Sequence, residues 1–542
     1  MMKAWRNFSI LVFVLSLVVG GLYATHLQAL TAETRDSMRL YTELLTKAHE
    51  NYGGDVTYRD LVYASIAGMT RTLDPHTNFL PPRAYEGMRE RQRSSFYGLG
   101  ILIGLRSSRV TVITPIEGGP ASRLGIRAGD IIDTIDGEST ESLSLDEAVS
   151  LLKGPKGTEV TITVLRAGLS DPLEMTVTRA EIPLTTVRHS YMLTPEVGYM
   201  RITDFNRGTG KEVAEALTGL KEQGMQRLLL DLRNNGGGLL DQAIEVGDLF
   251  VPDGGKIVET RGRTRNSHQT FFAEGEHPSL DIPVVVLVNS GTASAAEILA
   301  GAIQDHDMGI IAGTPTWGKG LVQTVYTLSY GAGVALTTAR YYTPSGRLIQ
   351  RDYSSPYDYY AYNPNTDTDE DGNLILSQPP EGEEAFLTDL GRQVYGGGGI
   401  TPDILVELDE VSPFLQFLHT RNAFFDFAVE YSNTHDIPDR SWTPSPKMIR
   451  DFETWIEGKE WGGEQELEEN LADPETADYI LRQIHAEVFN SEFGQDAWHE
   501  VLSRGDRQIQ RGLQLFGKAG DLLASRQDLQ EEIDRRAALE RD

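Results

Sequence analysis

The sequence predicts a multidomain α+β protein with an α/β core, a β-rich segment and a helical C-terminal extension. The chain has 542 residues, more than one hydrophobic core ordinarily covers, so about three domains are expected. Short, continuous apolar runs at 228–230 and 284–288 alternate with helical patterns, as in strands that an α/β core buries on both faces. Residues 412–542 are rich in charged helix formers, which predicts the extension.

Composition narrows the possible classes of function. The formal net charge of −30 opposes nucleic-acid binding, because phosphates attract Lys and Arg. The chain contains no cysteine, which excludes disulfides, thiolate nucleophiles, cysteine-based zinc or iron–sulfur sites and a lipid-modified N-terminal cysteine. We therefore expect the chemistry to come from other side chains. No cofactor is assigned to the chain.

The N-terminus predicts export. Lys3 and Arg6 precede an uncharged, mostly apolar run at 8–24, and small residues follow it, as in a signal peptide. The run is also nearly long enough to span a bilayer, with its basic residues left in the cytoplasm. Residues 1–30 are therefore either a cleaved signal peptide or a retained anchor in the cytoplasmic membrane, and the remainder is expected in the periplasm.

The next two segments differ in their patterns. Over residues 31–93, apolar residues recur at helical spacing, which predicts helices that end at Asp74. Over residues 94–182, short β-branched runs alternate with glycine turns, which predicts a small β domain. Within it we expect a helix at 145–152 and an Asp-Gly turn after a strand at 131–135.

Strands and helices alternate over residues 183–411, which predicts the α/β core. A Tyr-, Asp- and Pro-rich insertion interrupts it at about 352–382. Residues 412–542 predict a helical C-terminal domain that carries both signs of charge. These long helices are candidates for self-association or for binding an adaptor.

A serine hydroxyl is the first candidate catalytic group. Ser294 follows a predicted buried strand and a glycine turn, and a predicted helix begins just after it. A helix N-terminus offers free N–H groups and the positive end of its dipole to an oxyanion. The alternative is that Ser294 only caps the helix, which is the commoner role of such a serine.

A serine nucleophile needs a base, and Lys319 is the candidate. It is flanked by glycines and starts an alternating, strand-like pattern, in which positions 319 and 323 share one face. Gln323 would then orient the lysine amine. A lysine in a dry cleft has a lowered pKa and acts as a general base. The alternative is a solvated surface lysine, the usual state of lysine.

A triple-glycine turn completes the candidate site. Gly236 to Gly238 follow the apolar run at 228–230, and glycines let backbone N–H groups approach a ligand closely. Such N–H groups could complete an oxyanion hole. A phosphate-binding loop is the rival, but the chain lacks the Lys-Ser/Thr ending of a P-loop and a GxGxxG fingerprint.

Together these three segments resemble the C-terminal processing peptidases, also called tail-specific proteases. The resemblance extends from about Asp74 to Asp403. It includes four further motifs: Leu73-Asp74-Pro75-His76-Thr77, Phe96-Tyr97-Gly98-Leu99-Gly100-Ile101, Tyr341-Tyr342-Thr343-Pro344-Ser345-Gly346-Arg347 and Gly399-Ile400-Thr401-Pro402-Asp403. It implies a crotonase/ClpP-like α/β protease core with an inserted PDZ domain.

The resemblance assigns a role to each catalytic candidate. Ser294 would be the nucleophile, Lys319 the general base and Gln323 the residue that orients the lysine. The N–H groups of Gly238 and Ala295 would form the oxyanion hole, and the reaction would pass through an acyl-enzyme without a metal. One departure is Gly236, where the family often has proline. A strand near 343–349 is expected to pair with the extended substrate.

The β domain is expected to bind substrate tails as PDZ domains do. The peptide-binding candidates are Tyr97, Gly98, Leu99, Gly100 and Ile101. A glycine-rich loop before a strand presents N–H groups to a terminal carboxylate, and the strand edge accepts the peptide. Proteins with exposed C-terminal tails are thus the expected partners. Arg166, near the end of the domain, is a candidate for gating the active site.

An acidic loop gives a weaker metal candidate. Asp367, Asp369 and Asp371 have the spacing of a calcium loop, followed by Gly372. Position twelve of the loop is Gln378, so the usual bidentate Glu is missing. A solvated acidic hairpin is therefore the favoured interpretation, and no metal is assigned.

Two other functions stay open. In a Ser–His–Asp hydrolase, Asp305 and His306 would be the partners, but a ten-residue helix would carry His306 about 15 Å from Ser294. His76 and His189 cannot be placed from the sequence. A catalytically inactive PDZ scaffold is the second alternative, and the presence of serine, lysine, glutamine and both glycine turns opposes it.

Overall fold

The computed structural model divides the chain into two compact units. One contains Met1–Tyr85 with Thr324–Thr337, and the other contains Glu86–Gln323 with Thr338–Asp542. Among the described residues, no helix has the length and apolar character needed to cross a membrane, and the run at 8–24 lies outside them. The described residues are 32–275, 280–355, 359, 366–368, 374–376, 385–407, 411–459, 461 and 470–541.

Helices begin the first unit, as the sequence predicts. Helix α2 starts at a capping box, in which Thr57 and Asp60 each accept the other's backbone N–H with their side chains. Asp74 ends the helical stretch, because its carboxylate accepts the N–H groups of His76 and Thr77 and turns the chain. The elements are a helix at 32–51, α2 (Tyr58–Arg71), β1 (Asn78–Leu80) and, across the unit boundary, α3 (Pro82–Gln92).

The β-rich segment folds around a six-stranded sheet, the β-domain sheet. Its order is β3-β4-β5-β7-β8 with β6 beside β5, so β3 is an edge strand. Helix α5 is confirmed, and so is the Asp-Gly turn, where Asp136 and Gly137 have φ of 49° and 83°. The elements are β2 (Ser95–Gly98), β3 (Ile101–Arg106), β4 (Arg109–Pro115), α4 (Pro120–Arg123), β5 (Ile131–Ile135), β6 (Glu138–Ser139), α5 (Leu145–Leu152), β7 (Glu159–Leu165), β8 (Leu173–Thr178) and β9 (Ala180–Pro183), which pairs with β2.

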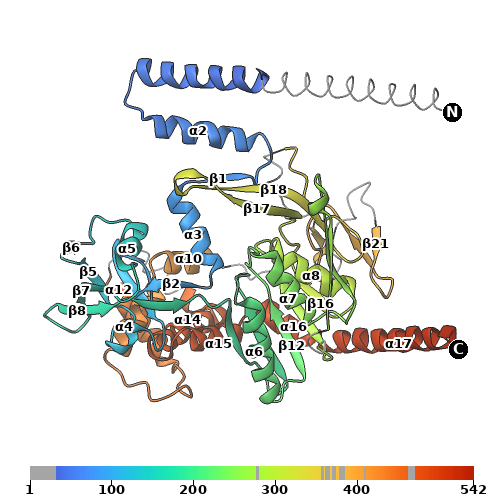
Figure 1. Cartoon of the computed structure of the whole chain (residues 1–542). Coiled ribbons are helices and arrows are strands. Elements are labelled where there is room, and N and C mark those ends of the chain that lie inside the picture. The colour runs from blue at the N-terminus through green and yellow to red at the C-terminus, as the bar shows by residue number, and fades with distance from the viewer. Residues whose placement is uncertain are drawn as a thin grey trace, which may run out of the picture. The chain divides into compact units, whose positions relative to one another are not determined.

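A second six-stranded sheet, the α/β sheet, has the order β10-β11-β12-β15-β16-β23. Strand β10 is antiparallel to β11, and the other neighbours are parallel. Figure 1 places α8 near β16 and α16 near β12. The elements are β10 (Val187–Met192), β11 (Val197–Ile202), α6 (Thr209–Glu222), β12 (Arg227–Asp231), α7 (Leu240–Asp248), β15 (Val284–Val288), α8 (Ala295–Asp305), β16 (Ile310–Gly313) and β23 (Ile404–Leu405).

Both faces of the α/β sheet are buried, as its apolar runs predict. Side chains alternate between the faces of a strand. Leu228 and Leu230 therefore join the core that α6, α7 and α8 cover. Leu229 joins a second core with Ile509 and Phe516 of the C-terminal helices. The extension thus supplies the second cover of this sheet.

The remaining strands form a five-stranded sheet of β1, β18, β13, β14 and β17, and the two-stranded sheets β19-β20 and β21-β22. Strand β18 pairs with β17 and, in its last part, with β13, whereas its first part pairs with β1. Asp367 lies in β19, and the other two candidate calcium ligands, Asp369 and Asp371, lie outside the described residues. The elements are β13 (Lys256–Gly262), η1 (Arg265–Ser267), β14 (Gln269–Phe272), β17 (Leu321–Thr327), η2 (Ser329–Gly331), β18 (Gly333–Tyr342), β19 (Thr366–Thr368), β20 (Leu374–Leu376), β21 (Ala385–Leu387) and β22 (Gln393–Tyr395).

The prediction of a strand at 343–349 is wrong. After β18 the chain turns instead, and only an isolated bridge remains in this segment. The buried carboxylate of Asp305 holds the turn, because it accepts the N–H and hydroxyl of Ser345 and a guanidinium N–H of Arg347. The contacts of Asp305 therefore hold these residues in a turn, and no strand forms here that could pair with a substrate.

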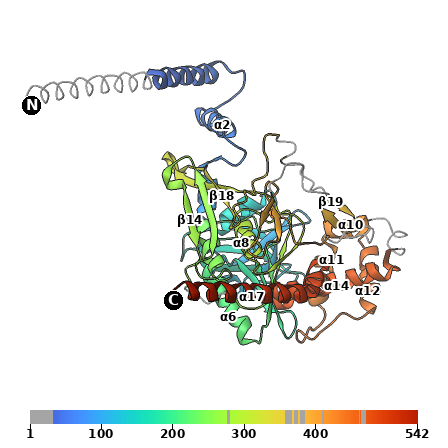
Figure 2. The same ribbon diagram turned by 90° about the vertical axis from the view of Figure 1, so that its right-hand side faces the viewer.

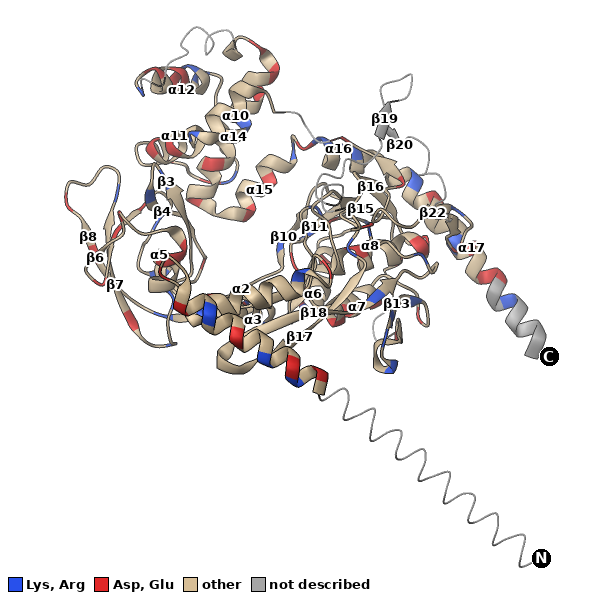
Figure 3. Cartoon of the chain, turned by 90° about the horizontal axis from the view of Figure 1, so that it is seen from above, with Lys and Arg blue, Asp and Glu red and all other residues tan. Residues whose placement is uncertain are grey.

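The C-terminal extension is helical, as predicted. Helices α10 to α15 enclose an aromatic core that includes Phe424, Phe427 and Phe452. Helix α17 forms the end of the described chain (Figure 2) and carries basic and acidic residues along its length (Figure 3). The elements are α10 (Pro413–Thr420), α11 (Ala423–Ser432), α12 (Lys447–Glu457), α14 (Pro474–Phe493), α15 (Gln495–Ser503), α16 (Arg507–Gln514) and α17 (Phe516–Arg541).

Candidate active site

A cavity of about 450 Å³ lies at the carboxyl ends of the strands of the α/β sheet. Each of β11, β12, β15 and β16 contributes residues from the segment that follows it, as is usual for sites on open α/β sheets. All five residues that the sequence singles out as catalytic are among its lining. That lining is Gln92, Thr203, Asp204, Gly236, Gly237, Gly238, Leu239, Leu240, Ser294, Ala295, Ile298, Lys319, Leu321, Val322, Gln323 and Tyr341.

Ser294 is held in a strained backbone conformation just before α8. Its φ is 56° and its ψ is −118°, a region that costs an L-residue on the order of 1–3 kcal/mol. The preceding loop is tied to the loop after β12: the Ala293 N–H donates to the Asn235 carbonyl at 2.8 Å, and the Thr292 hydroxyl donates to the Leu232 carbonyl at 2.8 Å. These bonds present a half-buried serine to the cavity at the start of a helix.

A buried carboxylate joins the serine segment to the lysine segment. The Oε2 atom of Glu297 accepts the N–H groups of Ser294 at 2.7 Å and Lys319 at 2.9 Å. Its Oε1 atom accepts the Gly318 N–H at 2.7 Å and the Thr316 hydroxyl at 2.5 Å. Burial raises the pKa of the Glu297 carboxyl, and the four hydrogen bonds oppose that rise. One side chain therefore fixes both backbone segments.

A tyrosine hydroxyl makes a second connection between the same two segments. The Tyr341 hydroxyl lies 2.6 Å from the Lys319 carbonyl oxygen and 3.0 Å from the Ser294 carbonyl oxygen. Burial, with the nearby Glu297 carboxylate, raises the pKa of Tyr341 well above its ordinary value. The hydroxyl therefore stays protonated and donates a hydrogen bond that the two carbonyl oxygens share.

Lys319 and Gln323 meet in the cavity. The Lys319 Nζ donates to Gln323 Oε1 at 2.9 Å. Lys319 does not start the strand, because β17 begins at Leu321 and the preceding Gly318 has a φ of 86°. The lysine is half-buried, and its amine is oriented by the glutamine while its backbone is held by the buried carboxylate.

The glycine turn after β12 packs directly against the serine. Gly237 has a φ of 96°, and a Cβ built there would lie 2.7 Å from both the Ala293 carbonyl oxygen and Ser294 Cβ. Only glycine fits such a position. A Cβ at Gly236 would meet nothing within 4 Å, so this position has room for a side chain.

Two N–H groups beside the serine are available to an oxyanion. Gly238 has a φ of 150° and is exposed to the cavity, and Ala295 is the first residue of α8. Within the described part of the chain, neither N–H has a hydrogen-bond acceptor. Their neighbours are fixed, because the Phe205 N–H donates to the Gly237 carbonyl at 3.0 Å.

No histidine lies among the described residues that line the cavity. His306 instead contacts Asp389 through Nδ1 at 2.8 Å and the Lys256 carbonyl oxygen through Nε2 at 2.7 Å. His189 pairs with Asp496 at 2.8 Å. Both histidines therefore have partners away from Ser294.

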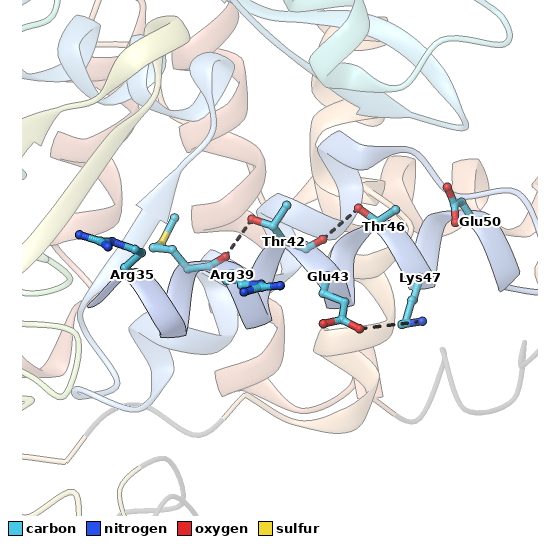
Figure 4. A pocket seen from close by; sticks show the side chains of 8 residues that line it. Arg35, Arg39, Thr42, Glu43, Thr46, Lys47 and Glu50 are labelled. Atoms are coloured by element: carbon cyan, nitrogen blue, oxygen red, sulfur yellow. Dashed lines mark hydrogen bonds and ion pairs between the residues drawn. The ribbon is translucent and has the colours of Figure 1, made fainter. Parts of the chain in front are cut away.

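A second, shallow hollow lies on the helix at 32–51. Figure 4 shows that its side chains, among them Arg35, Glu43 and Lys47, all come from this one helix. Glu43 and Lys47 form an exposed ion pair at 3.9 Å. The Thr42 and Thr46 hydroxyls donate to carbonyls of their own helix, and the lining contains no residue from another element, so this hollow is a weaker candidate. Among the described residues, no group of three His, Asp or Glu side chains is placed to hold a metal ion.

The predicted peptide-binding residues lie at the edge strand β3. Tyr97 is exposed in β2, which ends at Gly98, Leu99 is buried in the core of the β domain, and Ile101 starts β3. Gly100 has a φ of 72°, and the described residues offer no acceptor to the N–H groups of Leu99 and Gly100. Arg166 pairs with Asp130 of the same domain at 2.7 Å.

Sequence reasoning missed the contacts of three residues that shape this site. Glu297 had a readable signal, because a Ser followed three residues later by Glu is a capping-box pattern. Gly237 was seen as part of a turn, but its contact with Ser294 requires the fold. Tyr341 appeared only within a family motif, and no local pattern predicts that its hydroxyl reaches two distant carbonyls.

Comparison with known proteins identifies relatives of the chain. Residues 196–357 match peptidase family S41, and residues 111–166 match a PDZ domain. A carboxy-terminal-processing protease of Bartonella bacilliformis is 36% identical over 342 residues, which cover 62% of this chain and 74% of that protein. A carboxyl-terminal-processing protease of a Synechocystis species is 42% identical over 299 residues, 54% of this chain and 69% of that protein. Among solved structures, a photosystem II D1 C-terminal processing protease is 36% identical, covers 56% of this chain and 82% of that chain, and has a TM-score of 0.33.

Proposed function

Because the chain belongs to peptidase family S41, the family of the carboxy-terminal processing proteases, we propose that it is a serine endopeptidase that recognises protein C-terminal tails. As a member of this family, the chain is a serine-type peptidase. In our proposal Ser294 is the nucleophile, Lys319 the general base and Gln323 the residue that orients the base. The N–H groups of Gly238 and Ala295 form the oxyanion hole.

The proposed reaction has two halves. Neutral Lys319 takes the hydroxyl proton of Ser294 while Oγ attacks the peptide carbonyl carbon, and the oxyanion accepts both N–H groups. The C–N bond breaks as the Lys319 ammonium returns the proton to the leaving amine. Lys319 then deprotonates a water that attacks the ester, and Ser294 leaves with its proton.

One observation carries this assignment. The Lys319 amine lines the same cavity as Ser294 and donates to Gln323 at 2.9 Å. Glu297 holds the backbone N–H groups of Ser294 and Lys319 on a single oxygen atom, which supports a fixed distance between the two segments. Proximity of this kind is what an activated serine requires.

The test compares Ser294→Ala and Lys319→Ala with Ser290→Ala, an exposed serine of the same loop. Casein or peptide cleavage should disappear without the nucleophile and fall by about 10²–10⁴-fold without the base. Labelling by a fluorophosphonate should require Ser294 and persist in Ser290→Ala. Full cleavage by Ser294→Ala would rule out Ser294 as the nucleophile, and normal cleavage by Lys319→Ala would favour a histidine base. Absence of cleavage by the wild-type protein would favour the inactive PDZ scaffold.

We propose that the PDZ domain captures the substrate's C-terminal carboxylate. The unpaired N–H groups of Leu99 and Gly100 face no acceptor in the described residues, and edge strand β3 has a free side for peptide pairing. In the Ser294→Ala protein, which cannot cut its ligand, a tail peptide should bind at least about tenfold more tightly than its C-terminal amide. Equal binding of acid and amide would contradict carboxylate recognition.

The proposal also assigns a role or a domain to each segment of the chain. Residues 1–30 would export the protein or anchor it, 31–93 form the N-terminal helical region, 94–182 the PDZ domain, 183–411 the protease core and 412–542 the extension. An exported-reporter fusion to 1–30, followed by cell fractionation, tests the first assignment. Among the residues beyond 387 whose side-chain exposure the structure describes, no large hydrophobic side chain is exposed, so an adaptor or second copy would meet charged faces such as that of α17.

A further inference from the structure

A buried arginine lies where the C-terminal extension meets the glycine turn. Arg233 is 7% exposed. Its Nε and Nη2 donate to the Asp231 carboxylate at 2.9 Å and 2.6 Å. Its Nη1 donates to Asp506 at 2.8 Å and to the Gln508 side chain at 3.0 Å. Within the described residues, the extension alone therefore holds Nη1.

The two residues of the extension are themselves fixed. Asp506 begins α16, and its Oδ1 accepts the Ile509 N–H at 2.9 Å. The Gln508 amide donates to the Val406 carbonyl at 2.8 Å, which ties it to the end of the α/β sheet. The two side chains that accept from Arg233 are thus themselves held in place at the start of α16.

Arg233 directly precedes the loop that shapes the active site. Asn235, two residues later, accepts the Gly237 N–H on its side chain at 2.9 Å and the Ala293 N–H on its carbonyl at 2.8 Å. Gly237 packs against Ser294, and the next residue carries a candidate oxyanion donor. A shift at Arg233 would therefore pass along the backbone to the serine and to the oxyanion hole.

We propose that Asp506 is a positioning residue for the peptidase reaction, holding Arg233 so that the glycine turn stays in register with Ser294. This inference rests on the proposed function of Ser294 and Gly238. Without the Asp506 carboxylate, Arg233 keeps its pair with Asp231 but loses the charged acceptor of Nη1, so the buried guanidinium shifts toward its remaining partner. The extension is then a component of the active site as well as a cover for the α/β sheet.

The variant that isolates this role is Asp506→Asn. Asparagine is as good a helix cap as aspartate, so α16 keeps its start while the charge that holds Arg233 is lost. The matched control is Asp473→Asn, the same substitution at the exposed start of α14, where the carboxylate accepts the Thr476 N–H at 2.9 Å. Asp506→Glu keeps the charge and should restore part of the activity.

We expect Asp506→Asn to lower kcat by about 10- to 100-fold with KM within about twofold, because a misplaced oxyanion donor weakens only the transition state. Hydrogen exchange at 236–239 should be faster than in Asp473→Asn, while exchange elsewhere and binding of a tail peptide stay unchanged. Asp506→Glu should recover at least part of kcat.

Two results would overturn the inference. One is a folded Asp506→Asn protein whose kcat and loop exchange match those of Asp473→Asn. The other is a loss of kcat that comes with faster exchange throughout the α/β sheet, which would make Asp506 a purely structural residue. If Asp506→Asn does not fold, Gln508→Met takes its place, with a smaller loss of kcat and the same local exchange expected. The exchange readout needs no catalysis, so it tests the positioning even if Ser294→Ala proves active and the proposed function fails.

Discussion

Replacing Glu297 with glutamine tests whether one carboxylate holds the nucleophile and base segments together. The substitution keeps the size and shape of the side chain and removes its charge. It also replaces one of two acceptor oxygens with an NH₂ group. The number of hydrogen bonds that are lost depends on which oxygen is replaced. The four hydrogen bonds that Glu297 accepts allow the two cases to be compared.

An NH₂ group in the place of Oε2 would face the N–H groups of Ser294 and Lys319, and both bonds would be lost. In the place of Oε1 it would face the Gly318 N–H and the Thr316 hydroxyl, and the hydroxyl can rotate to accept. The second arrangement leaves one buried donor unpaired, at about 1–3 kcal/mol, and weakens the remaining bonds by removing their charge. We expect the free energy of unfolding to fall by about 2–4 kcal/mol.

The same change should lower kcat by about 100-fold, because both catalytic segments loosen and a displacement of about 1 Å has that effect. The assay is steady-state cleavage of a tail-bearing peptide, with urea denaturation to measure stability. Glu212→Gln is the matched control: Glu212 accepts the N–H groups of Thr186 at 2.6 Å and Val187 at 3.0 Å, away from the cavity. It should lose similar stability and keep kcat.

The reasoning is refuted if Glu297→Gln is folded and its kcat lies within about twofold of that of Glu212→Gln. A loss of kcat in both variants would refute it too, since activity would then follow global stability.

Three further changes test other contacts. Gly237→Ala should lower kcat by about 10²–10³-fold in the peptide assay, because its Cβ would displace Ser294. Gly236→Ala should keep its free energy of unfolding within about 0.5 kcal/mol of wild type and its kcat within about twofold. Equal effects of the two substitutions would be inconsistent with the contact between Gly237 and Ser294. Tyr341→Phe should cost about 1 kcal/mol in urea denaturation and about tenfold in kcat, and unchanged kinetics would remove its role in holding the two carbonyls. Burial lowers the pKa of His499 from 6.5 to about 3, so the unfolded chain binds a proton that the folded chain does not, and stability falls as pH drops below 6.5. Between about pH 7.5 and pH 5 this amounts to about 2 kcal/mol, measurable by urea titration, and His499→Gln should lose about that much less than wild type.

Local patterns predicted most elements because each depended on neighbouring residues. Helix α5 follows from apolar spacing after a Ser-x-x-Glu capping box, and the Asp136-Gly137 turn from residues that tolerate positive φ. The position of Ser294 after a buried strand and before a helix was readable for the same reason.

Local patterns failed where a distant side chain decided the structure. The resemblance leads to the expectation of a strand near 343–349, yet the buried carboxylate of Asp305 turns this segment through Ser345 and Arg347. An apolar run such as β15 indicates that both faces are covered, but it cannot say that residues near 509 and 516 provide one of the covers.

The sequence by itself determined the kind of protein: a glycine turn, a serine at a helix start, a lysine followed four residues later by a glutamine, and a β domain with a glycine-rich loop before a strand. Only the tertiary structure decided that Glu297 and Tyr341 join the serine and lysine segments and that Asp506 reaches the arginine beside the glycine turn. The physical reason is range. Spacing along a chain encodes helices, strands and turns, whereas a buried polar group finds its partners through packing that brings together residues hundreds of positions apart.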